Sequence, residues 1–171
     1  SRAGALGLGA RSRERMSEGM GAFDVTDWLA IQRLVHLYPR HLDSGDLAGL
    51  GNLFADAAVH FEGRADPVTN DPAGVSRMFE DFVRLYDGVP RTRHLICNLI
   101  VEPEDAVSAR STSTVLVVQA APDLPLQPII TGDYRDRFEK RAGVWRFTER
   151  FITNDLFGNL SAHGKYAIGD G

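Results

Sequence analysis

Cysteine is almost absent from this chain of 171 residues, in which Cys97 is the only thiol. A single cysteine excludes a disulfide within the chain and is typical of proteins that fold in a reducing compartment. Long apolar runs are absent too, and none approaches the roughly 20 residues that a membrane-spanning helix needs. We therefore expect a soluble, cytoplasmic protein with no membrane partner.

The sequence also lacks the motifs of most cofactor-dependent and covalent enzymes. It has no Gly-rich phosphate-binding loop, no HExxH, no cysteine cluster and no GxSxG nucleophile elbow. Five histidines are present without the spacing of metal ligands: His36, His41, His60, His94 and His163. We expect no cofactor and no metal, which leaves proton transfer by His, Asp, Tyr and Arg side chains.

Positive charge is in short supply as well. The 19 Lys and Arg residues are outnumbered by 23 Asp and Glu, and the net charge of -4 argues against a nucleic-acid partner. Apolar residues make up 43% and charged residues 25% of the chain, as in an ordinary globular domain. The length suits a single domain with a substantial core.

The two ends of the chain lack hydrophobic periodicity. Residues 1–22, rich in Gly, Arg and Ser, are expected to be a disordered leader or a segment introduced for expression, and Glu14 and Glu18 argue against a transit peptide. The folded domain is expected over 23–155. Residues 156–171 are expected to form a flexible tail.

Helical periodicity dominates the first half of the domain. An apolar stripe with steps of three and four predicts a helix over 24–44, which Pro39 should kink or split. A short helix is expected over 47–54 and a third over 72–87, where Pro72 follows the N-cap Asp71. The buried face of the third helix is expected to comprise Val75, Met78, Phe79, Phe82, Leu85 and Tyr86.

The second half alternates with a period of two. A short strand is expected over 57–61, and four longer ones over 92–102, 106–121, 127–138 and 144–153. Short connections make the four long strands an antiparallel meander, with a longer PDLPLQP loop between the second and third. Helices first and a meander last predict an α+β fold, with the helices on one face of a curved sheet.

The strand RTRHLICNLIVE contains the most informative histidine. Alternation places His94, Ile96, Asn98 and Ile100 on one face, with Cys97 on the opposite face. Both faces are largely apolar, so we expect the strand to be covered on both sides. His94 is then either a hydrogen-bonded packing residue or a base.

Asp43 stands at the carboxyl end of the first helix, where the helix dipole disfavours a negative charge. One interpretation is an exposed turn residue in DSGD. The other is that a nearby cation compensates the carboxylate. His36, two turns earlier, could supply it locally, and His94 could supply it across the fold.

Three stretches together resemble one family. They are the helix IQRLVHLYPRHLDSGD with the following LFADAAVHFEG, the strand start TRHLICN, and TGDYRDRFEKRAGVWRFTER. They resemble the SnoaL-like branch of the nuclear transport factor 2-like superfamily, in particular the sub-branch of hexachlorocyclohexane dehydrochlorinase and, more distantly, scytalone dehydratase. The resemblance implies a cone-shaped α+β barrel, in which a strongly bent, mixed or antiparallel sheet and three helices close a deep pocket.

The resemblance also implies catalytic residues. The catalytic Asp–His dyad of the sub-branch falls on Asp43 and His94, and its cavity arginine on Arg150. Tyr38 stands where the dehydrochlorinase has a lysine, which argues against dehydrochlorination. The strand 110–118 lacks the second histidine of scytalone dehydratase. In this scheme His94 is the base, Asp43 orients it, and Arg150 and Tyr38 stabilise an enolate or protonate a leaving hydroxyl. The structural alternatives are a surface ion pair of Arg150 with Glu149 or Asp136, and core packing of Tyr38.

The expected pocket is apolar and binds a small hydrophobic cyclic or aromatic substrate. Asn98 is a candidate for orienting a substrate oxygen, and the expected walls comprise Val59, Phe61, Phe79, Phe82 and Ile96. The resemblance favours a cofactor-independent lyase or isomerase, most of all a dehydratase. Two alternatives stay open: a polyketide aldol cyclase, and a non-catalytic scaffold like the small subunit of ring-hydroxylating dioxygenases.

The sheet is also expected to have an uncovered face. Three helices can cover only one side of so long a meander, and the other side would expose a mixed apolar and charged surface. A closed homo-oligomer, a dimer or a trimer, would bury it.

Overall fold

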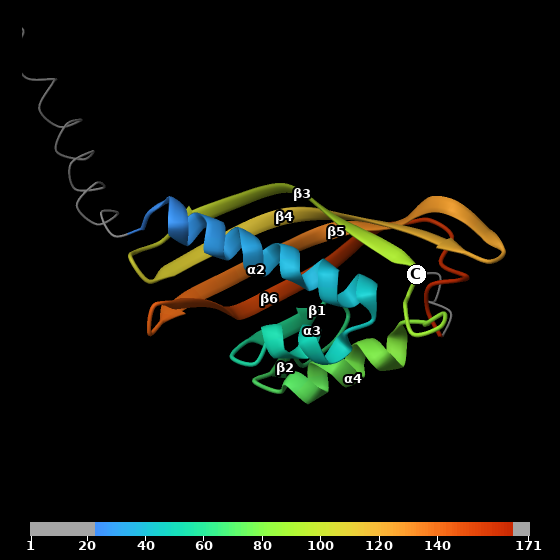
Figure 1. The fold of residues 1–171 in the computed structure, drawn as a ribbon, viewed down its shortest axis with the longest axis horizontal. Helices are drawn as coiled ribbons and strands as arrows, with labels where there is room; N and C mark the ends of the chain where they lie inside the picture. The colour runs from blue at the N-terminus through green and yellow to red at the C-terminus, as the bar shows by residue number, and fades with distance from the viewer. Residues whose placement is uncertain (1–22, 166–171) are drawn as a thin grey trace, which may run out of the picture.

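A computed structural model describes residues 23–165 (Figure 1). The expected leader 1–22 and the last residues, 166–171, lie outside this range. The helices are α2 (Val25–Ser44), α3 (Leu47–Leu53) and α4 (Pro72–Phe82). The strands are β1 (Ala58–Phe61), β2 (Val68–Thr69), β3 (Thr92–Pro103), β4 (Ser108–Ala121), β5 (Leu124–Arg141) and β6 (Val144–Phe157).

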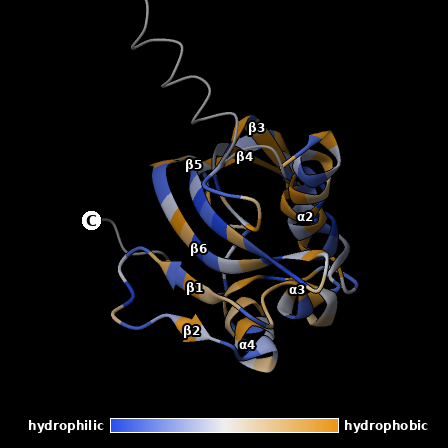
Figure 2. Cartoon of the chain, turned by 90° about the vertical axis from the view of Figure 1, so that its left-hand side faces the viewer, coloured by the Kyte–Doolittle hydropathy of each residue, from blue (hydrophilic) through white to orange (hydrophobic). Residues whose placement is uncertain are grey.

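The strands form one mixed sheet in the order β2-β1-β6-β5-β4-β3. The predicted antiparallel meander of β3 to β6 is confirmed, and β1 joins it parallel to β6. The sheet bends strongly, and all three helices lie on its concave side (Figures 1 and 2). The α+β class is therefore confirmed, but the expected barrel is wrong in one respect, because the sheet is open, with β2 and β3 at its edges.

Helix α2 is capped at both ends. Asp24 and Asp27 form a capping box at its start, and Gly45 ends it in the left-handed conformation at φ 77°. A Cβ on Gly45 would lie 2.0 Å from the carbonyl oxygen of Gly88, so only glycine fits there. The helix continues through Pro39 and does not split.

Two element boundaries differ from the prediction because backbone partners decide them. Helix α4 ends at Phe82 instead of near residue 87, since the backbone of Val83 and Arg84 pairs with Gly164 and His163. The predicted loop before β5 is absent, and a two-residue turn joins Ala121 to β5. The prolines of that stretch are tolerated because residues 124–128 pair only with β4.

Strand β3 contains the irregularity that matters most for the site. Its register shifts between Cys97 and Ile100, and Asn98 has a left-handed φ of 52°. The bulge exchanges the faces of all later residues. As a result Ile100 is 58% exposed, and the expectation that both faces of this strand are covered is wrong.

The core lies between the concave face and the helices, and it includes Ile31, Val35, Leu50, Phe54 and Phe147. Among the described residues, no helix is long and apolar enough to cross a membrane.

Candidate active site

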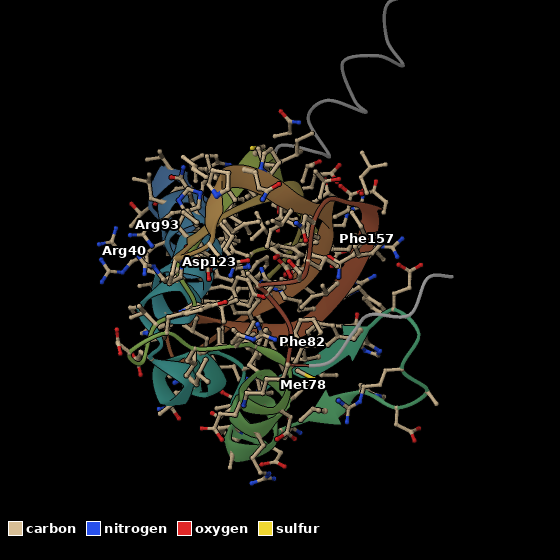
Figure 3. The ribbon with its side chains drawn as sticks, turned by 90° about the vertical axis from the view of Figure 1, so that its right-hand side faces the viewer. Arg40, Met78, Phe82, Arg93, Asp123 and Phe157 are labelled. Atoms are coloured by element: carbon tan, nitrogen blue, oxygen red, sulfur yellow. The ribbon has the colours of Figure 1, made fainter. Side chains whose placement is uncertain are left out.

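A cavity of about 650 Å³ lies between the helices and the concave face, at the end of the sheet where β3 begins and β6 ends. Figure 3 faces this end, with Met78 and Phe82 from α4 below and Phe157 from β6 at the side. The apolar wall comprises Leu42, Phe61, Met78, Phe79, Phe82, Val83, Val117, Ile130, Ile152 and Phe157. The uncharged polar and imidazole groups comprise Tyr38, Thr92, His94, Tyr134, Asn154 and His163.

Asp43 and His94 form a hydrogen-bonded pair at the wall of this cavity. The Nδ1 atom of His94 lies 2.7 Å from Oδ1 of Asp43, and their side chains are only 7% and 11% exposed. The backbone N–H of His94 donates to Oδ2 at 2.9 Å, and the Thr92 hydroxyl donates to Oδ1 at 2.7 Å. Three donors thus compensate the carboxylate at the end of α2. His36, the alternative partner, is exposed.

The electrostatics of Asp43 define the tautomer of His94. Burial raises the pKa of Asp43. The hydrogen bonds and charge of His94, together with the hydrogen bond from the Thr92 hydroxyl, lower it by more, so the pKa lies below its usual value of 3.8. Asp43 is therefore an anion at neutral pH and can only accept. The neutral His94 ring must then carry its proton on Nδ1 and present a lone pair at Nε2, as a general base requires.

Two tyrosines line the cavity beside the dyad. The ring of Tyr38 meets those of His94 and Tyr134 edge to face, at 6.3 and 5.5 Å between centroids. Burial raises the pKa of Tyr38 to about 12 and that of Tyr134 well above its usual value. Both phenols therefore hold their protons at neutral pH, and both residues line the cavity.

Arg150 lies behind these tyrosines, away from the cavity. It is fully buried, and its Nε and Nη2 atoms donate to the two carboxylate oxygens of Asp136 at 2.7 Å each. Nη1 has no hydrogen-bond partner within 23–165, but the guanidinium lies 4.5 Å from the ring centre of Tyr38 and 4.6 Å from that of Tyr134. Arg150, expected to stabilise an enolate in the pocket, therefore does not line the cavity; its guanidinium packs on two rings that do.

The model of one protein family matches most of the chain. Residues 24–151 match the profile of the SnoaL-like domain. The chain is a SnoaL-like domain. The predicted membership of the SnoaL-like branch of the nuclear transport factor 2-like superfamily is thereby confirmed.

Solved structures share the fold of this SnoaL-like domain. A protein from Novosphingobium aromaticivorans, proposed to be a scytalone dehydratase, is 22% identical with a TM-score of 0.64, over 86% of this chain and 96% of its own. A second protein from that organism, proposed to be an aromatic ring hydroxylase, is 20% identical with a TM-score of 0.64, over 82% and 98%. A Mycobacterium tuberculosis protein of unknown function is 25% identical with a TM-score of 0.63, over 85% and 84%. No curated protein gives a significant match.

Three predicted pocket residues of this SnoaL-like domain do not line the cavity. Val59 is fully buried in the core, where it pairs in register with Arg150. Ile96 packs against the same core, below His94 on β3. Asn98 is exposed, because it occupies the bulge and no longer shares the face of His94. The other predicted wall residues, Phe61, Phe79 and Phe82, line the cavity.

The C-terminal segment 158–165 supplies a cavity residue that the sequence analysis did not single out. Of the tail expected to be flexible, 156–165 lies within the described residues: β6 extends to Phe157, and the segment then bonds to the backbone beyond α4. Tyr86 and Gln119 both donate to the carbonyl of Ala162, at 2.8 and 3.1 Å. This anchoring places His163 in the cavity wall. The segment has no hydrophobic period, so the sequence carries no signal for it.

Strand alternation in the sequence was sufficient to place Tyr134 and Thr92 on the cavity side of the sheet. Tyr134 lies on the inward face of β5 with Asp136 and Phe138, and Thr92 precedes His94 by two residues on one face of β3. For metals, no three His, Cys, Asp or Glu side chains within the described part of the chain are grouped to hold an ion.

Proposed function

We propose that this SnoaL-like domain is a cofactor-independent lyase or isomerase, of the dehydratase type, acting on a small hydrophobic cyclic or aromatic molecule. The observation that carries the proposal is the 2.7 Å contact between His94 and an anionic Asp43 at the wall of a 650 Å³ cavity. A base held in one tautomer beside an apolar binding space is suited to removing a proton from carbon.

The reaction follows from the groups present. Nε2 of His94 takes the proton on the carbon next to the substrate carbonyl, and the C–H electrons form an enolate. The enolate then expels a hydroxyl group from the β carbon, which leaves as water after it receives a proton from the His94 imidazolium. The net change is loss of one water and formation of one carbon–carbon double bond.

Asp43 stabilises the transient imidazolium, because an ion pair is stronger in a buried, apolar site than in water. The Tyr38 and Tyr134 pair provides a phenol proton that donates a hydrogen bond to a substrate oxygen. Arg150 has a positioning role, since its guanidinium fixes both phenol rings from behind.

The cavity suits a substrate with one or two rings. Its volume is within the range of small-molecule sites, about 300–1,000 Å³. Its aromatic wall, with Phe61, Phe79 and Phe82, favours a flat apolar skeleton over a sugar.

Two features weigh against the scaffold alternative. A scaffold without an active site would leave Asp43 and His94 apart, or would fill the pocket with side chains, and neither condition is met. Aldol cyclisation uses the same base and differs only in where the enolate attacks, so product analysis must separate it from dehydration.

The test uses a bicyclic β-hydroxy ketone, the β-hydroxy derivative of α-tetralone, which aromatises to fluorescent α-naphthol when it loses water. The wild-type protein should accelerate naphthol formation over buffer, and His94→Ala and Asp43→Asn should lose this acceleration. His36→Ala, which removes an exposed histidine from the same helix as Asp43, is the matched control. Equal turnover in His94→Ala and wild type would refute the assignment; a ring-closed product from an open-chain diketone would favour the cyclase.

A further inference from the structure

His163 is a buried imidazole that the proposed dyad does not use. Its residue is 4% exposed, yet it lines the cavity together with His94. Its ring meets Phe82 edge to face at 5.6 Å, and Nδ1 is buried and has no hydrogen-bond partner among residues 23–165. A buried N–H without an acceptor is costly, so the neutral ring should carry its proton on Nε2 and leave Nδ1 unprotonated.

The segment that carries His163 is held by backbone and side-chain bonds that do not involve the imidazole. The carbonyl of His163 accepts from the N–H of Arg84, and its own N–H donates to Leu160, both at 2.9 Å. Tyr86 and Gln119 hold the carbonyl of Ala162 from the other side. These bonds place the imidazole ring at the cavity wall and leave it available to a ligand in the cavity.

We propose that His163 is a second substrate-contacting residue, a neutral imidazole whose Nε2–H donates a hydrogen bond to the carbonyl oxygen of the substrate. The assignment of Nε2 follows from the burial of Nδ1, which leaves Nε2 as the ring nitrogen that can meet a ligand. The proposal rests on the proposed function, because the same bond would stabilise the enolate oxygen as His94 removes the proton.

The charge state of His163 agrees with this role. Burial, with a smaller contribution from the charge of His94, lowers its pKa to about 4. The ring is then neutral at physiological pH, so it donates a hydrogen bond without competing with His94 for the abstracted proton. Arg150, which was expected to hold the developing negative charge, is bound to Asp136 and does not line the cavity.

The test compares two ligands that differ only in the carbonyl group, α-tetralone and tetralin, by calorimetric titration. The wild type should prefer α-tetralone, and His163→Phe should reduce this preference about 2- to 10-fold, the worth of one hydrogen bond. His163→Gln, whose amide N–H can replace Nε2–H, should recover part of it. Tyr86→Phe, which removes one bond from the same segment and leaves the imidazole, should keep the preference.

Equal weakening of both ligands in His163→Phe would show that the ring only packs, and a wild type without preference for α-tetralone would also overturn the proposal. This binding comparison does not depend on turnover, so it separates failure of His163 from failure of the proposed reaction. In the naphthol-forming assay, His163→Phe should lower kcat at least about 10-fold and change KM less, because the bond strengthens as the enolate forms.

Discussion

The sharpest perturbation of the site is Asp43→Asn, because asparagine has nearly the same shape as aspartate but only one acceptor oxygen. Oδ1 of Asp43 accepts from Nδ1 of His94 and from Thr92, while Oδ2 accepts from the backbone N–H of His94. If the new amide NH₂ replaces Oδ2, it faces the backbone N–H of His94, and two donors meet without an acceptor. If it replaces Oδ1, Nδ1 must accept and the ring proton moves to Nε2, which removes the base.

Both orientations have a measurable cost. The donor–donor contact should reduce the free energy of unfolding by about 1–3 kcal/mol, the cost of one buried unsatisfied group. The misplaced proton should reduce kcat by about 10²- to 10⁴-fold, the contribution of a positioned base. We expect the second effect to dominate in the naphthol-forming assay.

The stability difference should also depend on pH in a defined direction. Asp43 has a folded pKa below 3.8, so its stabilisation is present above that value and is lost as the pH falls through the folded pKa. The difference in unfolding free energy between wild type and Asp43→Asn should therefore be constant above about pH 5 and should shrink below 3.8. Chemical denaturation at a series of pH values measures it.

A matched control exists three residues away. Asp46 and His41 also lie 2.7 Å apart, but their side chains are 50% and 27% exposed. Asp46→Asn should leave kcat unchanged and stability nearly so, because Asn is as good an N-cap as Asp. Wild-type kcat in a folded Asp43→Asn protein, or an equal loss in Asp46→Asn, would refute the reasoning.

Three further predictions concern the support of the site and the assembly. Arg150→Met should reduce the unfolding free energy by about 3–5 kcal/mol, because it leaves Asp136 buried and unpaired, and adding Asp136→Leu should recover most of the loss in denaturant titrations. Gly45→Ala should destabilise the protein more than Gly63→Ala, because both residues have a positive φ but only at Gly45 would the new Cβ meet backbone atoms. A smaller loss at Gly45 in thermal unfolding would contradict this packing. The outer face of the sheet should be buried in a dimer or trimer, so light scattering should give a multiple of 18.8 kDa, and a single species at that mass would show that the face is solvated.

The Asp43–His94 contact could be predicted because Asp43 stands at the end of a helix that disfavours a negative charge. A carboxylate at the negative end of a helix needs compensation, and a histidine at the start of a β-strand was one of two possible partners. Choosing between His36 and His94 required the tertiary fold. The order of helices and strands followed from hydrophobic period, so the α+β class could also be predicted.

Other parts of the site depend on contacts that leave no periodic pattern. The bulge at Asn98 changes which side chains of β3 face the core, and no turn signal in the sequence marks it. The Arg150–Asp136 pair was considered as a surface ion pair, but only the sheet register and the aromatic rings around it make it buried. His163 reaches the cavity through backbone bonds to the chain beyond α4.

The central claim is that His94 removes a proton from carbon in this cavity, and hydrogen–deuterium exchange into α-tetralone tests it without any leaving group. In D₂O, the wild-type protein should exchange the hydrogens next to the carbonyl faster than buffer alone, as followed by proton NMR. His94→Ala and Asp43→Asn should return the rate to that of buffer, and Asp46→Asn should not. Exchange at the buffer rate with wild type, or undiminished exchange with His94→Ala, would contradict the account.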